Sequence, residues 1–125
     1  MRTLAALVAV LALAAGCGSS GGGTSLPTGQ PGRVVDVTLK DFAIDCADCG
    51  SLPTGQVTFH VTNDGPSTHN LTVGQGGTML NTTQNFPKGQ QRDVTVDLHP
   101  GSYTLYCSVP GHEAQGMKLD VTVGS

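Results

Sequence analysis

The amino-acid sequence predicts an all-β fold, a β-sandwich. Short runs alternate apolar and polar residues with period two, and clusters of Gly, Pro, Asn and Asp separate these runs. The 18 glycines and 7 prolines indicate many turns, as an all-β architecture needs. Hydrophobic residues make up 38% of the 125 residues and charged residues 12%, which is apolar enough for a packed core and too apolar for a disordered chain.

The first segment, residues 1–16, predicts a bacterial lipoprotein signal peptide. Arg2 provides a positive start, and the apolar stretch from Leu4 to Ala15 is too short to span a bilayer as a helix. Small residues then precede Cys17 and resemble a lipobox, so we expect Cys17 to be lipidated and to anchor the chain in the membrane. The alternative is an ordinary secretory signal with an incidental cysteine.

Residues 17–32 contain the lipidated Cys and a Gly/Ser-rich stretch without apolar periodicity, which predicts a flexible linker. Such a tether would let the domain of residues 33–125 swing between partners while it stays close to the membrane. We therefore expect the protein at the extracytoplasmic face of the cell membrane, periplasmic or on the cell surface.

The alternation of apolar and polar residues over 33–125 predicts about six or seven antiparallel strands, each with one face buried. In chain order, the inward positions are Val35, Val37 and Leu39; Val57, Phe59 and Val61; Leu71 and Val73; Val94, Val96 and Leu98; Tyr103, Leu105 and Cys107; and Met117, Leu119, Val121 and Val123. Turn residues lie at 63–66, 87–89 and 99–101. The polar stretch 74–86 has no pattern that predicts an element.

The last hairpin carries the residues that point to chemistry. Cys107, His112 and Met117 follow one another at intervals of five residues. A thiolate, an imidazole and a thioether together suit copper, and a trigonal site of two His and one Cys needs a second imidazole. His69, at the start of a predicted strand after a turn, can supply it from elsewhere in the fold.

From about Arg33 to Val123 the chain resembles the cupredoxins, the type 1 blue-copper family that includes plastocyanin, azurin, rusticyanin and auracyanin. The matching residues are His69-Asn70, Tyr106-Cys107, Pro110-Gly111-His112 and Gly116-Met117. The spacing Cys-x4-His-x4-Met is most similar to rusticyanin and auracyanin within that family.

This resemblance implies a Greek-key β-sandwich with one mononuclear type 1 copper, Cu(I) or Cu(II). The implied ligands are His69, Cys107 and His112, with Met117 as the weak axial ligand. Asn70 would tie the two ligand loops together by hydrogen bonds.

The implied function is transfer of single electrons between redox partner proteins outside the cytoplasm, with the ring edge of His112 as the electron port. We expect a monomer that is not an enzyme. The six basic residues are scattered, so no nucleic-acid partner is predicted.

The alternatives are two other functions and two other kinds of metal site. A copper chaperone or other copper-binding protein could use the same residues. A copper enzyme such as a nitrite reductase would need further His ligands, for which His60 and His99 are too few. Zinc is a poor match to a site with one Cys, two His and a Met. A binuclear copper site is excluded, because it needs a second Cys where Gly111 stands.

Cys46 and Cys49 form a Cys-x-x-Cys pair outside the cytoplasm, and we predict a local disulfide. A thioredoxin-like redox motif would need a helix to begin there, and the residues that follow, 50–53, read as a turn. A second metal site is the remaining alternative.

Overall fold

The structure is a computed structural model and describes residues 32–124. The predicted signal peptide, Cys17 and nearly all of the predicted linker lie outside the described residues. The described residues lie within one compact unit.

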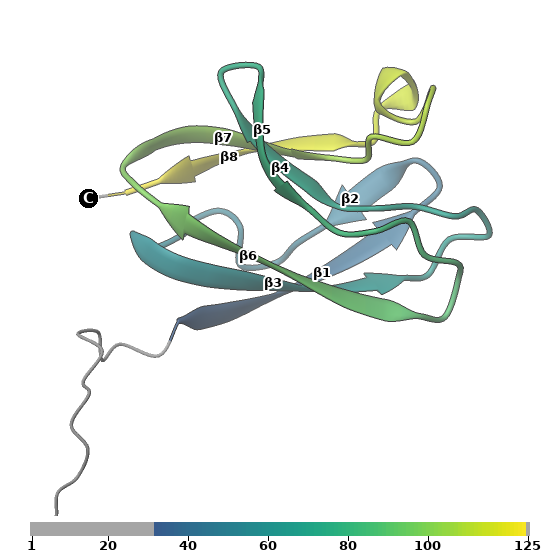
Figure 1. The fold of residues 1–125 in the computed structure, drawn as a ribbon, viewed down its shortest axis with the longest axis horizontal. Helices are drawn as coiled ribbons and strands as arrows, with labels where there is room; N and C mark the ends of the chain where they lie inside the picture. The colour runs from purple at the N-terminus through teal and green to yellow at the C-terminus, as the bar shows by residue number, and fades with distance from the viewer. Residues whose placement is uncertain (1–31, 125) are drawn as a thin grey trace, which may run out of the picture. The chain divides into compact units, whose positions relative to one another are not determined.

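Two four-stranded sheets make up this unit, so the prediction of an all-β sandwich is confirmed (Figure 1). One sheet has the order β2-β1-β3-β6, and the other has the order β5-β4-β7-β8. The bounds are β1 Arg33–Lys40, β2 Ala43–Asp45, β3 Gly55–Asn63, β4 Thr72–Gln75, β5 Thr78–Thr82, β6 Gln91–Leu98, β7 Gly101–Tyr106 and β8 Lys118–Val123. A 3-10 turn, η1 Glu113–Gln115, lies in the loop between β7 and β8.

The core lies between the sheets and is formed by the predicted inward positions. Val35, Val37 and Leu39 of β1 and Val57, Phe59 and Val61 of β3 are all buried. Burial of a side chain of this size contributes roughly 1.5–3 kcal/mol to stability, so the alternating pattern fixes which face of each strand points inward. Leu119 differs from the prediction, since it is only partly buried against this core.

The strand count and one pairing differ from the sequence-based prediction. Residues 32–124 form eight strands, and β1 pairs with β3 in parallel, with Val35 opposite Phe59. The chain between them reverses direction after β1, so that β2 pairs antiparallel with β1. It then passes the disulfide and reaches Leu52, which forms a parallel bridge with Val123 of β8. These two reversals bring β3 alongside β1 in the same direction.

The stretch 74–86 contains β5, which pairs with β4 in a hairpin. Every residue of β5 is exposed, so it has no alternating pattern that the sequence could display. Gly74 lies at a bulge in β4, where an added Cβ would come within 3.2 Å of the Thr78 carbonyl oxygen and of the Tyr106 ring.

Cys46 and Cys49 are joined by a disulfide just after β2, with their Cα atoms 5.4 Å apart. Cys49 is buried, so the cross-link also contributes to the core. Over residues 32–124, no helix is long and apolar enough to cross a membrane.

Candidate metal centre

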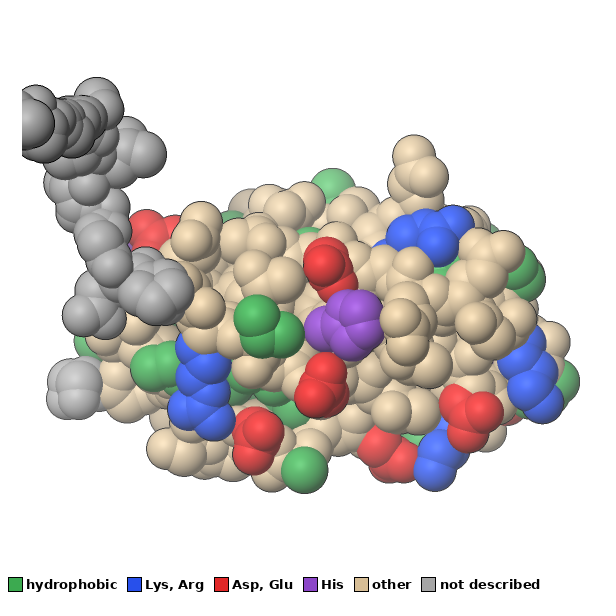
Figure 2. All heavy atoms as spheres, turned by 90° about the horizontal axis from the view of Figure 1, so that it is seen from below, with side chains coloured by type: hydrophobic (Ala, Val, Ile, Leu, Met, Phe, Trp, Pro, Cys, Tyr) green, Lys and Arg blue, Asp and Glu red, His purple; other side chains and the backbone are tan. Residues whose placement is uncertain are grey.

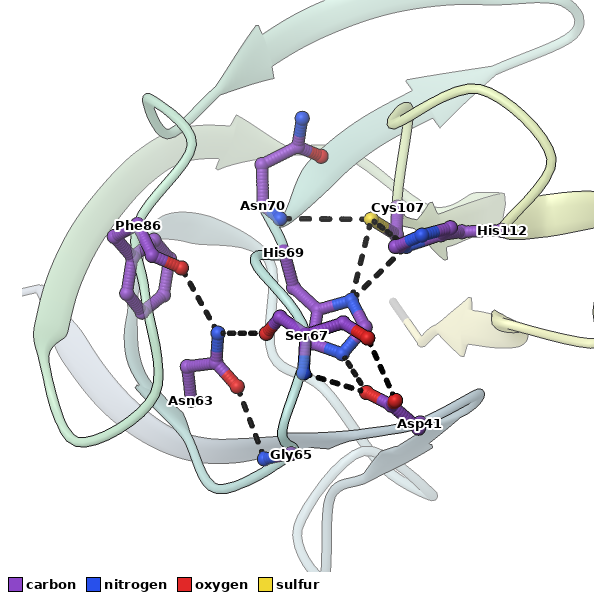
Figure 3. Close-up of polar contacts among 9 residues, drawn as sticks. All are labelled: Asp41, Asn63, Gly65, Ser67, His69, Asn70, Phe86, Cys107 and His112. Carbon is purple, nitrogen blue, oxygen red and sulfur yellow. Dashed lines mark hydrogen bonds and ion pairs between the residues drawn. The ribbon is translucent and has the colours of Figure 1, made fainter.

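The fold brings His69, Cys107 and His112 together at one end of the sandwich (Figure 3). His69 lies in the connection between β3 and β4, Cys107 directly follows β7, and His112 lies in the loop that leads to β8. One possible ligand atom from each residue lies within 4.8 Å of the others. These are three of the four residues that the sequence predicted as ligands.

The separations of the donor atoms suit one bound ion. His69 Nδ1 lies 3.0 Å from His112 Nδ1, and Cys107 Sγ lies 3.5 Å from His112 Nδ1 and 3.9 Å from His69 Nδ1. Bonds of about 2 Å to nitrogen and about 2.3 Å to sulfur leave donors about 3–4 Å apart around a metal. His69 and Cys107 are fully buried, whereas His112 is partly exposed.

The loop from β7 to β8 is held closed by its own main chain. Cys107 N donates to the Met117 carbonyl, Met117 N donates to the His112 carbonyl, and His112 N donates to the Val109 carbonyl. Gly116 has a φ of 105°, a left-handed conformation that other residues rarely adopt. The main chain of Met117, the fourth predicted ligand, is therefore hydrogen-bonded to the main chains of Cys107 and His112. The Met117 side chain is fully buried.

Asn70 connects the segment of His69 with the segment of Cys107 by hydrogen bonds. Its side-chain oxygen accepts from Ser108 N at 2.8 Å, and its Nδ2 donates to Ser108 Oγ at 2.8 Å and to Asn85 Oδ1 at 2.7 Å. Its main-chain N lies 3.5 Å from Cys107 Sγ and can donate to it. The thiol is thus held from the side of the β3–β4 connection as well as by its own loop.

A second asparagine, Asn63 at the end of β3, shapes the approach to His69. Its Nδ2 donates to the carbonyls of Ser67 at 2.9 Å and Phe86 at 2.8 Å, and its Oδ1 accepts from Gly65 N at 3.0 Å. The sequence predicts only a turn in this segment. The buried amide fixes that turn, so His69 leaves it at a defined position.

The turn between β1 and β2 supplies two residues of the centre that the sequence analysis missed. Asp41 Oδ1 lies 2.6 Å from His69 Nε2. The Phe42 ring packs edge-on against the rings of His112 and His69, with centroids 5.1 and 6.4 Å away. Asp41 is 28 positions from His69 in the sequence, and no local pattern signals that the two meet.

Ser67 holds the Asp41 carboxylate from both sides. Ser67 Oγ donates to Asp41 Oδ2 at 2.7 Å, and Ser67 N donates to Oδ1 at 3.2 Å. The hydrogen bond from the Ser67 hydroxyl, together with the one from His69, lowers the pKa of Asp41 below its ordinary value, although partial burial acts in the opposite direction. The carboxylate is therefore ionised near neutral pH.

The remaining histidines do not join this centre. His60 Nδ1 pairs with Asp93 Oδ1 at 2.6 Å on the outer face of the β2-β1-β3-β6 sheet, and His99 Nε2 lies 3.9 Å from Asp97. Cys46 and Cys49 are bonded to each other and offer no thiolate. On the face drawn in Figure 2, acidic and basic side chains are scattered and form no large patch of one sign.

A family model described as a cupredoxin-like domain matches residues 4–119 of the chain. Among solved structures, auracyanin from Roseiflexus castenholzii is similar with a TM-score of 0.64 and 20% identity, over 77% of this chain and 100% of that chain. Auracyanin B has a TM-score of 0.65 and 22% identity, over 83% and 97%. Rusticyanin from Thiobacillus ferrooxidans has a TM-score of 0.59 and 18% identity, over 74% and 79%.

No curated protein sequence matches the chain. The family match nevertheless spans most of its length, and the solved structures share its fold. The protein is thus a member of the cupredoxin-like family.

Proposed function

We propose that this domain binds one copper ion through His69, Cys107 and His112, with Met117 as a weak axial ligand, and carries single electrons. The observation that carries the proposal is the convergence of one thiol and two imidazoles in a largely buried pocket. Two His and one Cys with a thioether nearby form the donor set of blue-copper electron-transfer sites. Auracyanin A, which shares the fold, is a blue copper protein.

Copper would supply a couple between two oxidation states that differ by one electron. The protein's part is to hold the donors so that little moves when the charge changes. Asn70 and Asn63 fix the ligand loops through hydrogen bonds, and the packed core holds the strands from which these loops start. The main-chain N–H of Asn70 beside Cys107 Sγ withdraws electron density from the sulfur.

One of the proposed ligands lies near the surface. His112 is partly exposed, with Val109 partly buried and Pro110 exposed beside it, whereas His69 and Cys107 are fully buried. We assign His112 as the electron port, since its ring edge and these apolar neighbours can meet a redox partner directly.

The proposal extends to the location of the protein. Residues 1–16 would be removed as a signal peptide, Cys17 would be lipidated, and residues 17–32 would tether the domain of residues 33–125 outside the cytoplasm. The test is metabolic labelling of the full chain with an alkyne fatty acid in a bacterium. Label incorporation that Cys17→Ala abolishes supports the anchor, and equal label in both chains rejects it.

Absorption spectroscopy tests the copper centre directly. Residues 18–125, which contain all eight strands, are loaded with Cu(II). We expect an intense visible band from thiolate-to-copper charge transfer that Cys107→Ser abolishes. The matched control is the double variant Cys46→Ser/Cys49→Ser, which should keep the band. A colourless Cu(II) form rejects the proposal.

Voltammetry of the same sample separates a carrier from a copper-delivery protein. A carrier must show a reversible one-electron wave, and the bound copper must remain in place through repeated cycles. Loss of copper on reduction contradicts the carrier role and points to delivery.

A further inference from the structure

The ring of His69, a proposed ligand, contacts a carboxylate through the nitrogen that faces away from the other donors. His69 is fully buried, and its Nε2 lies 2.6 Å from a carboxylate oxygen of Asp41, whose side chain is 21% exposed. The other ring nitrogen, Nδ1, faces Cys107 Sγ and His112 Nδ1. Figure 3 shows the imidazole between the carboxylate on one side and the thiol and second imidazole on the other.

The carboxylate decides which nitrogen of His69 carries the proton. An ionised carboxylate can only accept hydrogen bonds, so the neutral ring must place its hydrogen on Nε2. Nδ1 then keeps its lone pair, and this lone pair points at the position where the donors converge. A ring with the opposite tautomer would present an N–H there and could not bind a metal.

The carboxylate is itself fixed in place. Ser67 donates to both of its oxygens, through Oγ to Oδ2 and through N to Oδ1. With both oxygens engaged, the carboxylate cannot rotate away from the imidazole without losing a hydrogen bond.

The turn beside this pair leaves just enough room for it. A Cβ added to the buried Gly65 would lie 2.6 Å from Asp41 Oδ1 and 3.0 Å from His69 Nε2. The backbone thus approaches the hydrogen bond so closely that only a residue without a side chain fits. Two segments, the β1–β2 turn and the turn after β3, are shaped around one contact.

We propose that Asp41 is a positioning residue that fixes the tautomer and orientation of His69 and, through its negative charge, favours the oxidised metal over the reduced metal. This inference rests on the proposed copper function and adds a tuning residue to it. A carboxylate that accepts from a metal-bound imidazole raises the basicity of that ligand. A more basic ligand and a nearby negative charge both stabilise Cu(II) relative to Cu(I), so the reduction potential is lowered.

The decisive variant is Asp41→Asn, in which the amide oxygen can still accept from Nε2 while the charge is removed. The matched control is Asp93→Asn, which removes the same charge from the other His–carboxylate pair, where Asp93 Oδ1 lies 2.6 Å from His60 Nδ1. Both are measured by voltammetry of copper-loaded residues 18–125. We expect Asp41→Asn to shift the ratio of Cu(II) to Cu(I) affinity about tenfold towards Cu(I), a rise of about 59 mV for a one-electron couple. Asp93→Asn should leave the potential unchanged.

A second readout needs no copper. In the metal-free chain, nitrogen NMR should show His69 with Nε2 protonated and Nδ1 unprotonated. In Asp41→Ala the ring should become a mixture of tautomers, while Asp93→Asn keeps the wild-type pattern at His69. Unchanged His69 nitrogens in Asp41→Ala overturn the positioning role.

The outcomes separate this inference from the copper proposal. A blue, reversible wild type with equal potentials in Asp41→Asn and Asp93→Asn overturns the tuning role and leaves the carrier function intact. A colourless wild type rejects the carrier function, and the NMR measurement still decides whether Asp41 sets the tautomer of His69. If Asp41→Ala fails to fold, the nitrogen shifts are measured in Asp41→Asn instead. The amide oxygen of Asn can still accept from Nε2, so the single tautomer should persist. A mixture of tautomers in this variant would contradict the role of the hydrogen-bond acceptor.

Discussion

At the scale of single residues, the centre depends as much on the hydrogen-bonding side chains around it as on the ligands. Asn70 is 5% exposed and bonds Ser108, Asn85 and Thr72 with its side chain. Asn70→Ala removes these bonds from a buried position, although of the three partners only Thr72 is itself buried. Each bond is worth about 1 kcal/mol, so we expect a loss of roughly 2–4 kcal/mol of unfolding free energy in urea titrations.

The control for this prediction is Asn81→Ala. Asn81 also bonds main-chain groups, at Thr95 and Thr82, but it is exposed on β5, where water can replace it. Asn81→Ala should lower the unfolding free energy by less than about 1 kcal/mol. Equal losses in the two variants would mean that the burial of Asn70 does not increase the contribution of its hydrogen bonds to the unfolding free energy.

Gly65 gives a steric prediction at the same scale. Gly65→Ala places a Cβ 2.6 Å from Asp41 Oδ1 and 2.9 Å from Asp41 N, so the Asp41–His69 contact must open. Overpacking of this kind costs roughly 1–3 kcal/mol, which thermal or urea unfolding would show. Gly50→Ala is the control, because an added Cβ there meets no atom within 4 Å. A stability of Gly65→Ala that matches Gly50→Ala would contradict the tight fit.

His60 predicts a dependence of stability on pH. Its hydrogen bond with Asp93, ahead of the charges of Asp93 and Asp36, raises the pKa of His60 above 6.5 in the folded state. The stabilisation is therefore complete below the unfolded-state pKa and is lost as pH rises through the folded-state value. We expect His60→Gln to lower the unfolding free energy more at about pH 5.5 than at about pH 9, by less than about 1 kcal/mol because the pair is solvent-exposed.

Urea titrations at the two pH values measure this difference. His99→Gln is the control, since His99 Nε2 is 3.9 Å from Asp97 and both side chains are exposed. A loss in His60→Gln that is larger at high pH would contradict the assigned sign.

At the scale of elements, the sequence predicts what its local patterns encode. The strands with an alternating buried face were predicted, as were the positions of the turns. The exposed β5 and the three-residue β2 were missed, because neither has an alternating pattern long enough to read. The parallel pairing of β1 with β3 was also missed, since it depends on the path of the chain between them.

The same limit applies to the centre. Spacing within one loop predicted Cys107, His112 and Met117, the need for a second imidazole predicted His69, and the resemblance added Asn70. Asp41 and Phe42 could not be predicted, because no spacing in the sequence connects these two residues with His69. Only the three-dimensional packing of the β1–β2 turn against His69 shows that they belong to it.

The disulfide gives a prediction for an element. Cys46 and Cys49 are only three positions apart, and a loop this short gains about 2 kcal/mol in the chain-entropy model. Cys46→Ser/Cys49→Ser should therefore lower the melting temperature by roughly 10 °C in a domain of this size. Because the pair lies outside the cluster of donor atoms, its removal should leave the copper potential unchanged. A shift of the potential would instead mean that β2 transmits strain to Phe42.

At the scale of the whole molecule, the centre is closed by contacts between distant parts of the chain. His69 and Cys107 are 38 positions apart, and Asp41 contacts His69 from a third segment. Copper bound to His69 and Cys107 together must favour the folded chain, because these two residues meet only there. At a free metal concentration 100 times the dissociation constant, one site adds about 2.7 kcal/mol to the unfolding free energy.

We therefore expect anaerobic urea unfolding with excess Cu(I) to require more denaturant than unfolding of the metal-free chain, with the slope against urea unchanged. His69→Ala tests the origin of the effect, because Cys107, His112 and Met117 can still bind a metal within one loop after the domain has unfolded. Such local binding would stabilise the unfolded chain too, so the gain should shrink in this variant. An equal gain in wild type and His69→Ala would show that the loop alone holds the metal and that the sandwich does not assemble the site.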